Sequence, residues 1–117
     1  MKWKDREIPD PPSKVGEPSS SKNTPGGIEL KATVVDEVGI ICDYDIEVYY
    51  KIFQVIQYAG DEIEYGFRIA YWRYNEKKNC WVWGQYNQII SPEEWEKLYQ
   101  KALEKGFFPN HESRYQE

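Results

Sequence analysis

The sequence predicts an α+β fold in which an antiparallel β-meander of four to five strands carries one C-terminal α-helix packed on one face. Three observations predict it. Residues 1–27 hold five of the seven prolines and scarcely any large apolar side chain after Ile8. Residues 28–90 are rich in β-branched and aromatic residues, and residues 91–106 repeat apolar residues at helical spacing.

The chain of 117 residues has the size of a single domain. The proline-rich segment cannot bury enough apolar surface to offset the entropy of ordering it, so we expect it to be a disordered arm. Trp3 stands out there, as either a docking anchor or an accident of sequence. The expected regions are a disordered N-terminal arm over 1–27, a single α+β domain over 28–108 and a frayed tail over 109–117.

The strands follow in order from residue 28. IELKATVV and IICDYD are extended runs, and the turn-like DEVG between them predicts a first hairpin. A long strand is expected over residues 46–60, where β-branched and aromatic residues occupy nearly every position. EYGFRIAYWRYN then forms another strand, NEKKN a polar loop, and CWVWGQYNQII the last strand of the meander.

The helix is the element with the clearest signals. Ser91 is a natural N-cap, Pro92 suits the first helical position, and Glu94 completes a capping box. Gly106 is the expected left-handed residue after the helix, followed by a hydrophobic contact from Phe107. One apolar stripe is expected to cover the sheet, formed by Trp95, Leu98, Tyr99, Ala102 and Leu103.

Alternation sorts the aromatic residues of the last two strands onto faces. Because a single helix covers one face, we expect the other to expose a patch, the kind of surface that marks a binding partner. Its rings are Trp72, Tyr74, Trp81 and Trp83. The alternative is a sheet covered on both faces, with another strand layer or a second subunit opposite the helix.

We therefore expect a small non-enzymatic interaction module, a homodimer, whose aromatic face binds a protein partner. The alternative is a single-stranded nucleic acid, whose bases would stack on the rings while nearby cations contact phosphates. The net charge of −5 favours the protein partner. The candidate binding residues are Arg68, Trp72, Arg73, Tyr74, Lys77, Lys78, Trp81 and Trp83.

Other chemistry finds little support in the sequence, and we expect no enzyme activity, cofactor or bound metal. The only histidine lies in a polar tail, and no nucleophile elbow or glycine-rich phosphate loop is present. Asp43, Asp45 and Glu47 alternate, but an EF-hand would need glycine where Val48 stands, so a solvated acidic face is expected.

The cysteines and the hydropathy of the sequence indicate the cellular compartment. Cys42 and Cys80 are too few for a disulfide framework, although both lie in strand-like runs and could be neighbours in a sheet. We expect two reduced, mostly buried thiols. No apolar run has the length of a secretion signal or a membrane span, so we expect a cytoplasmic protein with no membrane contact.

Three stretches point to a known family: RIAYW at 68–72, the loop NEKKN and IISPEEWEKL at 89–98. Over about residues 46–105 they resemble the positive cofactor four family of transcriptional coactivators, where an arginine-and-aromatic strand, a loop and a strand end lead into a Pro-Glu-x-Trp helix. The resemblance implies single-stranded-DNA binding and dimerisation through a curved sheet and C-terminal helix. The chain departs from the family at 86–88, where Tyr-Asn-Gln replaces a basic Lys-Gly pair.

Overall fold

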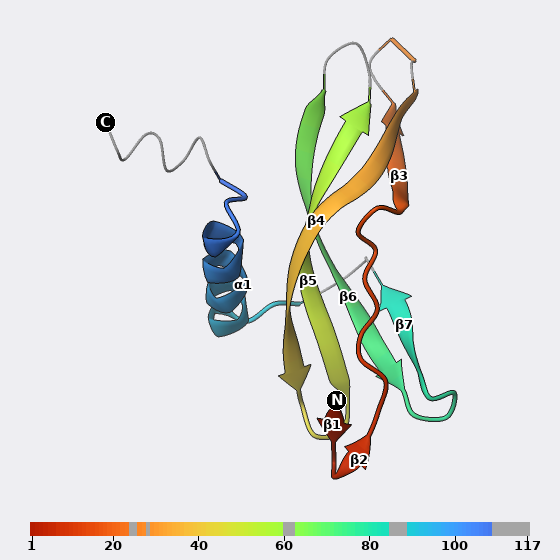
Figure 1. Cartoon of the computed structure of the whole chain (residues 1–117), viewed down its shortest axis with the longest axis vertical. Coiled ribbons are helices and arrows are strands. Elements are labelled where there is room, and N and C mark those ends of the chain that lie inside the picture. Colours follow the sequence, from red (N-terminus) through yellow and green to blue (C-terminus); the bar gives the residue numbers. More distant parts are fainter. Residues whose placement is uncertain (24–25, 28, 60–62, 85–88, 109–117) are drawn as a thin grey trace.

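The structure, a computed structural model, consists of one five-stranded antiparallel sheet, a small hairpin of two strands and one helix (Figure 1). The sheet order β3-β4-β5-β6-β7 follows the chain, so the predicted α+β meander with a C-terminal helix is confirmed. The structure describes residues 1–23, 26–27, 29–59, 63–84 and 89–108. The elements are β1 Lys2–Trp3, β2 Arg6–Glu7, β3 Pro18–Asn23, β4 Glu29–Asp43, β5 Val48–Ala59, β6 Glu64–Asn75, β7 Cys80–Gly84 and α1 Pro92–Glu104.

The predicted first hairpin is wrong, because β4 runs through the DEVG sequence without turning. Gly39 pairs with Ile52 inside the sheet, and a Cβ atom on Gly39 would lie 2.3 Å from Cζ of Tyr50. The glycine is therefore needed for the close approach of a tyrosine ring. Val35 is the extra residue of a β-bulge, which bends the long strand where the sequence suggested its end.

The later strands follow the predicted alternation. β6 has the expected bounds, and the polar loop after it forms the turn to β7. The register pairs Tyr50 with Trp72, Trp72 with Trp83, and Tyr74 with Trp81, so the predicted rings share one face. The last strand ends at Gly84 in the described residues. Of its expected continuation, residues 85–88 lie outside the described residues, and Ile89 and Ile90 are not in a strand, which corrects the predicted end.

The helix begins and ends as predicted. The Ser91 hydroxyl accepts a hydrogen bond from the Glu94 backbone amide, and the Glu94 carboxylate accepts one from the Ser91 amide. At the other end Gly106 adopts φ of 79°, and the amides of Gly106 and Phe107 donate to the carbonyls of Leu103 and Ala102. These are the two bonds of a Schellman motif.

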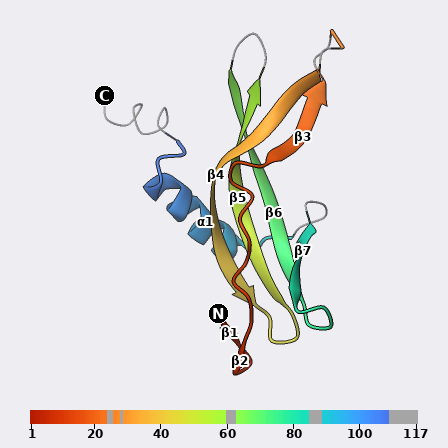
Figure 2. The ribbon, with the colours of Figure 1, turned by 45° about the vertical axis from the view of Figure 1, so that its right-hand side comes forward.

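The sheet has a separate apolar layer on each face. Between β4, β5 and α1 the buried side chains are Val38, Ile40, Cys42, Phe53, Leu98 and Ala102. On the opposite face one buried cluster comprises Trp3, Ile8, Val48, Tyr74 and Trp81, and a second comprises Ala32, Val34 and Ile56. Figure 2 shows α1 and the N-terminal segment on opposite sides of the sheet.

The predicted disorder of the N-terminal arm is corrected by the structure over the residues that it describes. Residues 1–17, which we call the N-terminal strap, run along the face opposite the helix, and residues 18–23 form the edge strand β3 (Figure 1). Trp3 and Ile8 are each only 3% exposed. These two buried side chains supply the apolar burial that orders the segment, although its average composition predicts disorder. Residues 24–25 and 28 of the arm and the tail at 109–117 lie outside the described residues.

The two cysteines are free, as predicted, but only one is buried. Cys42 lies under the helix, whereas Cys80 begins the edge strand β7 and is exposed, which corrects the expectation for that thiol. No helix in the part of the chain that the structure describes has the length and apolar character needed to cross a membrane.

Candidate functional site

The aromatic face comprises Trp72, Tyr74, Trp81 and Trp83, on the side of the sheet away from α1. The ring centroids of Trp72 and Trp83 are 5.0 Å apart, and those of Tyr74 and Trp81 are 5.5 Å apart. Both pairs are edge-to-face contacts between neighbouring strands, the geometry that aromatic quadrupoles favour. The sequence thus predicted the shared face. The expected exposed patch is wrong for Tyr74 and Trp81, which are buried, and the alternative of a covered face fits better. The cover is the N-terminus of the chain itself and not another strand layer or a second subunit.

The N-terminal strap covers this face, and Trp3 is its first anchor. The Trp3 ring meets Tyr74 edge-to-face with 5.8 Å between centroids, and its indole N–H donates to an Asp43 carboxylate oxygen at 3.2 Å. Mutual backbone hydrogen bonds between Met1 and Ile8 close the β1–β2 hairpin and hold Ile8 against the same cluster. The covered rings of Tyr74 and Trp81 are only 6% and 8% exposed.

The proline-containing part of the strap continues across the rings. The indole N–H of Trp81 donates to the Pro9 carbonyl at 2.8 Å. Farther along, the Lys14 ammonium lies 4.7 Å from the Trp83 ring centroid and 5.6 Å from that of Trp72. The strap is therefore held by the indole hydrogen bonds of Trp3 and Trp81 and by cation–π contacts as well as by burial.

One polar atom of the aromatic face has no partner. The Trp72 indole nitrogen is buried and makes no hydrogen bond, the only buried side-chain polar atom without one in the described part of the chain. Leaving a buried donor unpaired costs roughly 1–3 kcal/mol. The strap therefore satisfies Trp81 but leaves a second indole donor of the same face unsatisfied.

The predicted cations do not gather around the rings. Arg68 shares their face, but its guanidinium donates to Gln54 Oε1 at 2.9 and 2.7 Å and to the Ser19 hydroxyl, and it stacks near Trp83. Burial lowers the pKa of Arg68 from its ordinary value. Arg73 points to the opposite face, and Lys77 and Lys78 are exposed in the β6–β7 turn.

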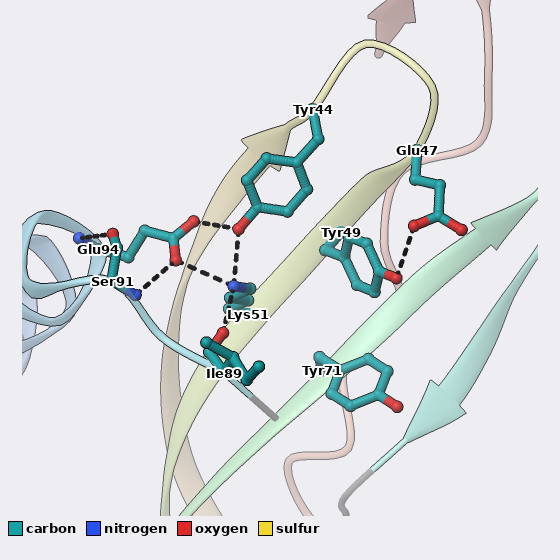
Figure 3. Close-up of a pocket in the computed structure, with 8 residues that line it drawn as sticks. All are labelled: Tyr44, Glu47, Tyr49, Lys51, Tyr71, Ile89, Ser91 and Glu94. Atoms are coloured by element: carbon teal, nitrogen blue, oxygen red, sulfur yellow. Dashed lines mark hydrogen bonds and ion pairs between the residues drawn. The ribbon is translucent and has the colours of Figure 1, made fainter. Parts of the chain in front are cut away.

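A second site, missed by the sequence analysis, is a pocket of about 490 Å³ on the helix side of the sheet (Figure 3). We call it the tyrosine pocket. One wall comes from the start of α1 and the segment before it, and the other from β5, β6 and the β4–β5 turn. Its lining residues are Tyr44, Glu47, Tyr49, Lys51, Tyr71, Ile89, Ser91 and Glu94.

A buried ion pair forms one wall of the tyrosine pocket. Lys51, which is 5% exposed, donates to Glu94 Oε1 at 2.9 Å, to the Tyr44 hydroxyl at 2.7 Å and to the Ile89 carbonyl at 2.7 Å. The Tyr44 hydroxyl in turn donates to the other Glu94 oxygen. These bonds fix the first turn of the helix to the sheet, since Glu94 is also the capping-box residue.

The ionisation of this wall follows from its hydrogen bonds. Burial favours the neutral Glu94 acid, but hydrogen bonds from the Ser91 amide, Tyr44, Cys42 and Lys51 outweigh it and lower the pKa of Glu94 to about 2. Burial, followed by the Glu94 carboxylate, raises the pKa of the Cys42 thiol to about 12 and raises that of the Tyr44 hydroxyl from its ordinary value. Lys51 and Glu94 therefore form a fixed charge pair.

Three tyrosine rings form the other wall. The centroids of Tyr44 and Tyr49 are 5.7 Å apart, and those of Tyr49 and Tyr71 are 5.6 Å apart. The Tyr49 hydroxyl donates to Glu47, and Tyr71 lies across Gly84, where a Cβ atom would come within 2.3 Å of its Cζ. Figure 3 shows the rings in a row facing the Lys51–Glu94 wall.

Two features of the sequence relate to this pocket. Lys51 interrupts the apolar run of β5, and a charged residue there requires a buried partner. The acidic residues Asp43, Asp45 and Glu47 are exposed, as expected, but they lie at the end of β4 and in the β4–β5 turn and not along one strand. There Asp43 accepts from Trp3 and from the Asp45 amide, while Glu47 lines the pocket. The described residues contain no group of side chains suited to hold a metal ion.

No protein-family model matches the sequence, and neither the curated proteins nor the solved structures contain a match. The resemblance to the positive cofactor four family and the homodimer that it implies stay predictions.

Proposed function

We propose that the chain is a small non-enzymatic interaction module that binds an extended, proline-containing segment of a partner protein on its aromatic face. In the free chain the N-terminal strap occupies this face, and the partner segment acts by displacing it. The observation that carries the proposal is the hydrogen bond of 2.8 Å from the Trp81 indole to the Pro9 carbonyl.

The strap defines the chemistry that the face accepts. Proline restricts the backbone to extended conformations and lowers the entropy lost on docking, which is why aromatic grooves recognise proline-rich segments. The strap presents Pro9, Pro11 and Pro12 between a buried apolar anchor, Ile8, and the cation of Lys14. A partner segment is expected to combine the same three features.

The unpaired Trp72 indole supports exchange of the strap for a better ligand. Its buried nitrogen gains a partner if the incoming segment places a backbone carbonyl within hydrogen-bonding distance. The strap is an intramolecular ligand with an effective concentration on the order of 1 mM, so a partner that uses both indoles can compete with it. Trp72 is thus expected to distinguish the partner from the strap.

A protein partner is favoured over single-stranded nucleic acid by the charges. Arg68 lies near Trp83 but donates to Gln54 and Ser19, and Arg73 lies on the opposite face. Lys14 belongs to the strap and leaves the rings when the strap is displaced, so these cations are poorly placed for phosphate contacts. The net charge of −5 also opposes a polyanion. An oligonucleotide that bound and quenched tryptophan emission in a salt-dependent manner would favour the alternative.

The experiment uses the full-length chain with its strap weakened by Trp3→Ala and a fluorescent peptide of the sequence of residues 1–17. We expect saturable binding by the variant, at least about tenfold weaker binding by the wild type because its own strap competes, and none of a scrambled peptide. Trp81→Phe, which keeps a ring but lacks the indole donor, is the second variant and is expected to bind the peptide more weakly in the Trp3→Ala background.

Failure of a folded Trp3→Ala chain to bind the peptide would overturn the proposal, with circular dichroism and amide exchange used to verify the fold. Exchange of straps between two copies would give the predicted homodimer. It is recognised in the same samples as a dimer whose population rises with protein concentration.

A further inference from the structure

We propose that the tyrosine pocket binds an organic ammonium cation, either a free quaternary amine or a methylated lysine side chain. The juxtaposition that carries this proposal is a row of three tyrosine rings facing a neutralised ion pair, with one additional carboxylate at the rim (Figure 3). The site lies on the helix side of the sheet and does not depend on the aromatic face or on the strap.

The rings provide the surface that such cations prefer. Tyr44 lies in the β4–β5 turn, Tyr49 in β5 and Tyr71 in β6, and successive rings are tilted by 57° and 66°. Inclined tyrosine rings present faces and edges around a common space, and their quadrupoles attract an alkylammonium group more than its neutral analogue. The Lys51 ammonium lies at the hydroxyl edge of Tyr44 and not over its face, so it leaves the ring faces to a ligand.

The charges exclude an anion as the natural ligand. All three protons of the Lys51 ammonium are used by Tyr44, Ile89 and Glu94, so none remains for an incoming anion. The charges of Lys51 and Glu94 compensate each other. Glu47 remains at the rim, and its only hydrogen bond among the described contacts comes from the Tyr49 hydroxyl, so the lining carries one net negative charge.

The pocket is also open and of suitable size. Its volume of about 490 Å³ lies within the range of about 300–1,000 Å³ that is typical of small-molecule sites. The Tyr44 side chain is 48% exposed, and Glu47 is exposed, so a ligand can reach the rings without unfolding the wall. A row of rings that served only the core would be covered.

The experiment titrates the full-length chain with choline, with its neutral isostere in which carbon replaces nitrogen, and with a peptide carrying trimethyllysine. Binding is followed through the NMR signals of the tyrosine rings. We expect saturable shifts at Tyr44, Tyr49 and Tyr71, and about tenfold weaker binding of the neutral isostere. Tighter binding of the peptide identifies a methylated protein as the source of the cation, and tighter binding of choline identifies a free amine.

Variants of charge test the site without removing a ring. Glu47→Gln is expected to weaken choline binding several-fold. Arg73→Gln is expected to strengthen it, because Arg73 lies next to Tyr49 on the same face without lining the pocket.

Variants of the rings test the aromatic contribution. Tyr49→Leu should abolish choline binding and Tyr49→Phe should retain it. Tyr65→Leu changes an exposed tyrosine outside the pocket and should leave choline binding unchanged. Equal binding of choline and its isostere, or no ring shifts at the highest soluble ligand concentration, would overturn the proposal.

Discussion

The two faces of this sheet use aromatic side chains in opposite ways. On the strap side, Trp3, Tyr74 and Trp81 are buried against one another, and the chain itself supplies their cover. On the helix side, α1 packs mainly against β4 and β5, and Tyr71 and Phe67 of β6 remain partly or half exposed. The same kind of residue is thus covered by the chain itself on one face and left partly open on the other.

The difference lies in what covers each face and how reversibly it does so. The helix is fixed by a capping box, a Schellman motif and the buried Lys51–Glu94 pair. The strap is held by two buried anchors, by the indole hydrogen bonds of Trp3 and Trp81, by backbone hydrogen bonds of Gly16 and Glu17 to Val34, and by exposed charge contacts, and it leaves the Trp72 donor unpaired. We therefore expect the strap to open at a lower free-energy cost than the helix, as is usual for segments with few buried contacts.

The largest expected effect comes from removing the first anchor of the strap. Trp3→Ala is expected to lower the free energy of unfolding by about 3–5 kcal/mol, since the ring and its contact with Tyr74 are lost from a buried cluster. Denaturant unfolding measures the loss, and amide exchange should show the strap opening while α1 stays protected. Leu98→Ala removes a fully buried side chain of the helix side and is the matched control. In this variant the amides of the strap and of α1 should lose protection together. Uniform loss of protection in Trp3→Ala would show that the strap is not a separate unit.

Breaking the ion pair of the helix side is the next largest effect. Glu94→Gln is expected to cost about 3 kcal/mol at neutral pH, because the Lys51 ammonium is left buried without its counter-charge. Chemical denaturation measures it, and Lys51→Met combined with Glu94→Gln should recover part of the loss. A double variant less stable than Glu94→Gln alone would contradict this account.

The same pair predicts a pH dependence. Glu94 has a pKa of about 2 in the folded state against an ordinary value of 4.5, so the unfolded state binds the additional proton between these values. The stability contributed by Glu94 is complete above about pH 4.5 and is lost as the pH falls towards 2. Denaturant unfolding at several pH values measures this. Between pH 4.5 and 2 the free energy of unfolding should fall more steeply with decreasing pH in the wild type than in Glu94→Gln. An equal pH dependence of the free energy of unfolding in the two proteins would mean that Glu94 is not held in its ionised form.

The glycines that admit tyrosine rings give a direct comparison of the faces. Gly39→Ala places a Cβ atom 2.3 Å from Cζ of Tyr50 and is expected to cost about 1–3 kcal/mol, because that ring packs against the strap-side cluster. Gly84→Ala creates the same overlap with Tyr71, whose ring borders the open pocket and can move away, so it should cost less. The loss of thermal stability in each variant gives the ranking. Gly66→Ala is the mild control, because its Cβ atom would lie 3.2 Å from the Tyr58 ring. The reverse order would mean that the pocket is as closely packed as the covered face.

The smallest expected effect concerns the indole hydrogen bond. Trp81→Phe removes the donor to Pro9 while keeping an aromatic ring, and it should lower stability by about 1 kcal/mol beyond the loss of ring size. Denaturant unfolding measures the change. Trp83→Phe is the control, because no hydrogen bond of its indole to the strap is found among the described contacts.

The parts of this structure that sequence reasoning reached are those governed by local rules. The caps of α1 follow from Ser91, Glu94 and Gly106, and alternation along β6 and β7 predicted which rings share a face. The strap was missed because its average composition predicts disorder, while its order rests on Trp3 and Ile8 meeting residues far along the chain. The tyrosine pocket was missed for the same reason, since the partners of Lys51 lie on another element.

The central claim is that the aromatic face is a receptor for an extended segment, filled in the free chain by its own strap. The most direct measurement is the proton–nitrogen NMR spectrum of the indoles in full-length Trp3→Ala during titration with an unlabelled peptide of residues 1–17. We predict that the Trp81 indole signal moves saturably to its wild-type position while that of Trp95, on the helix, does not move. A Trp81 signal that stays in place, or that moves together with Trp95, would contradict the account.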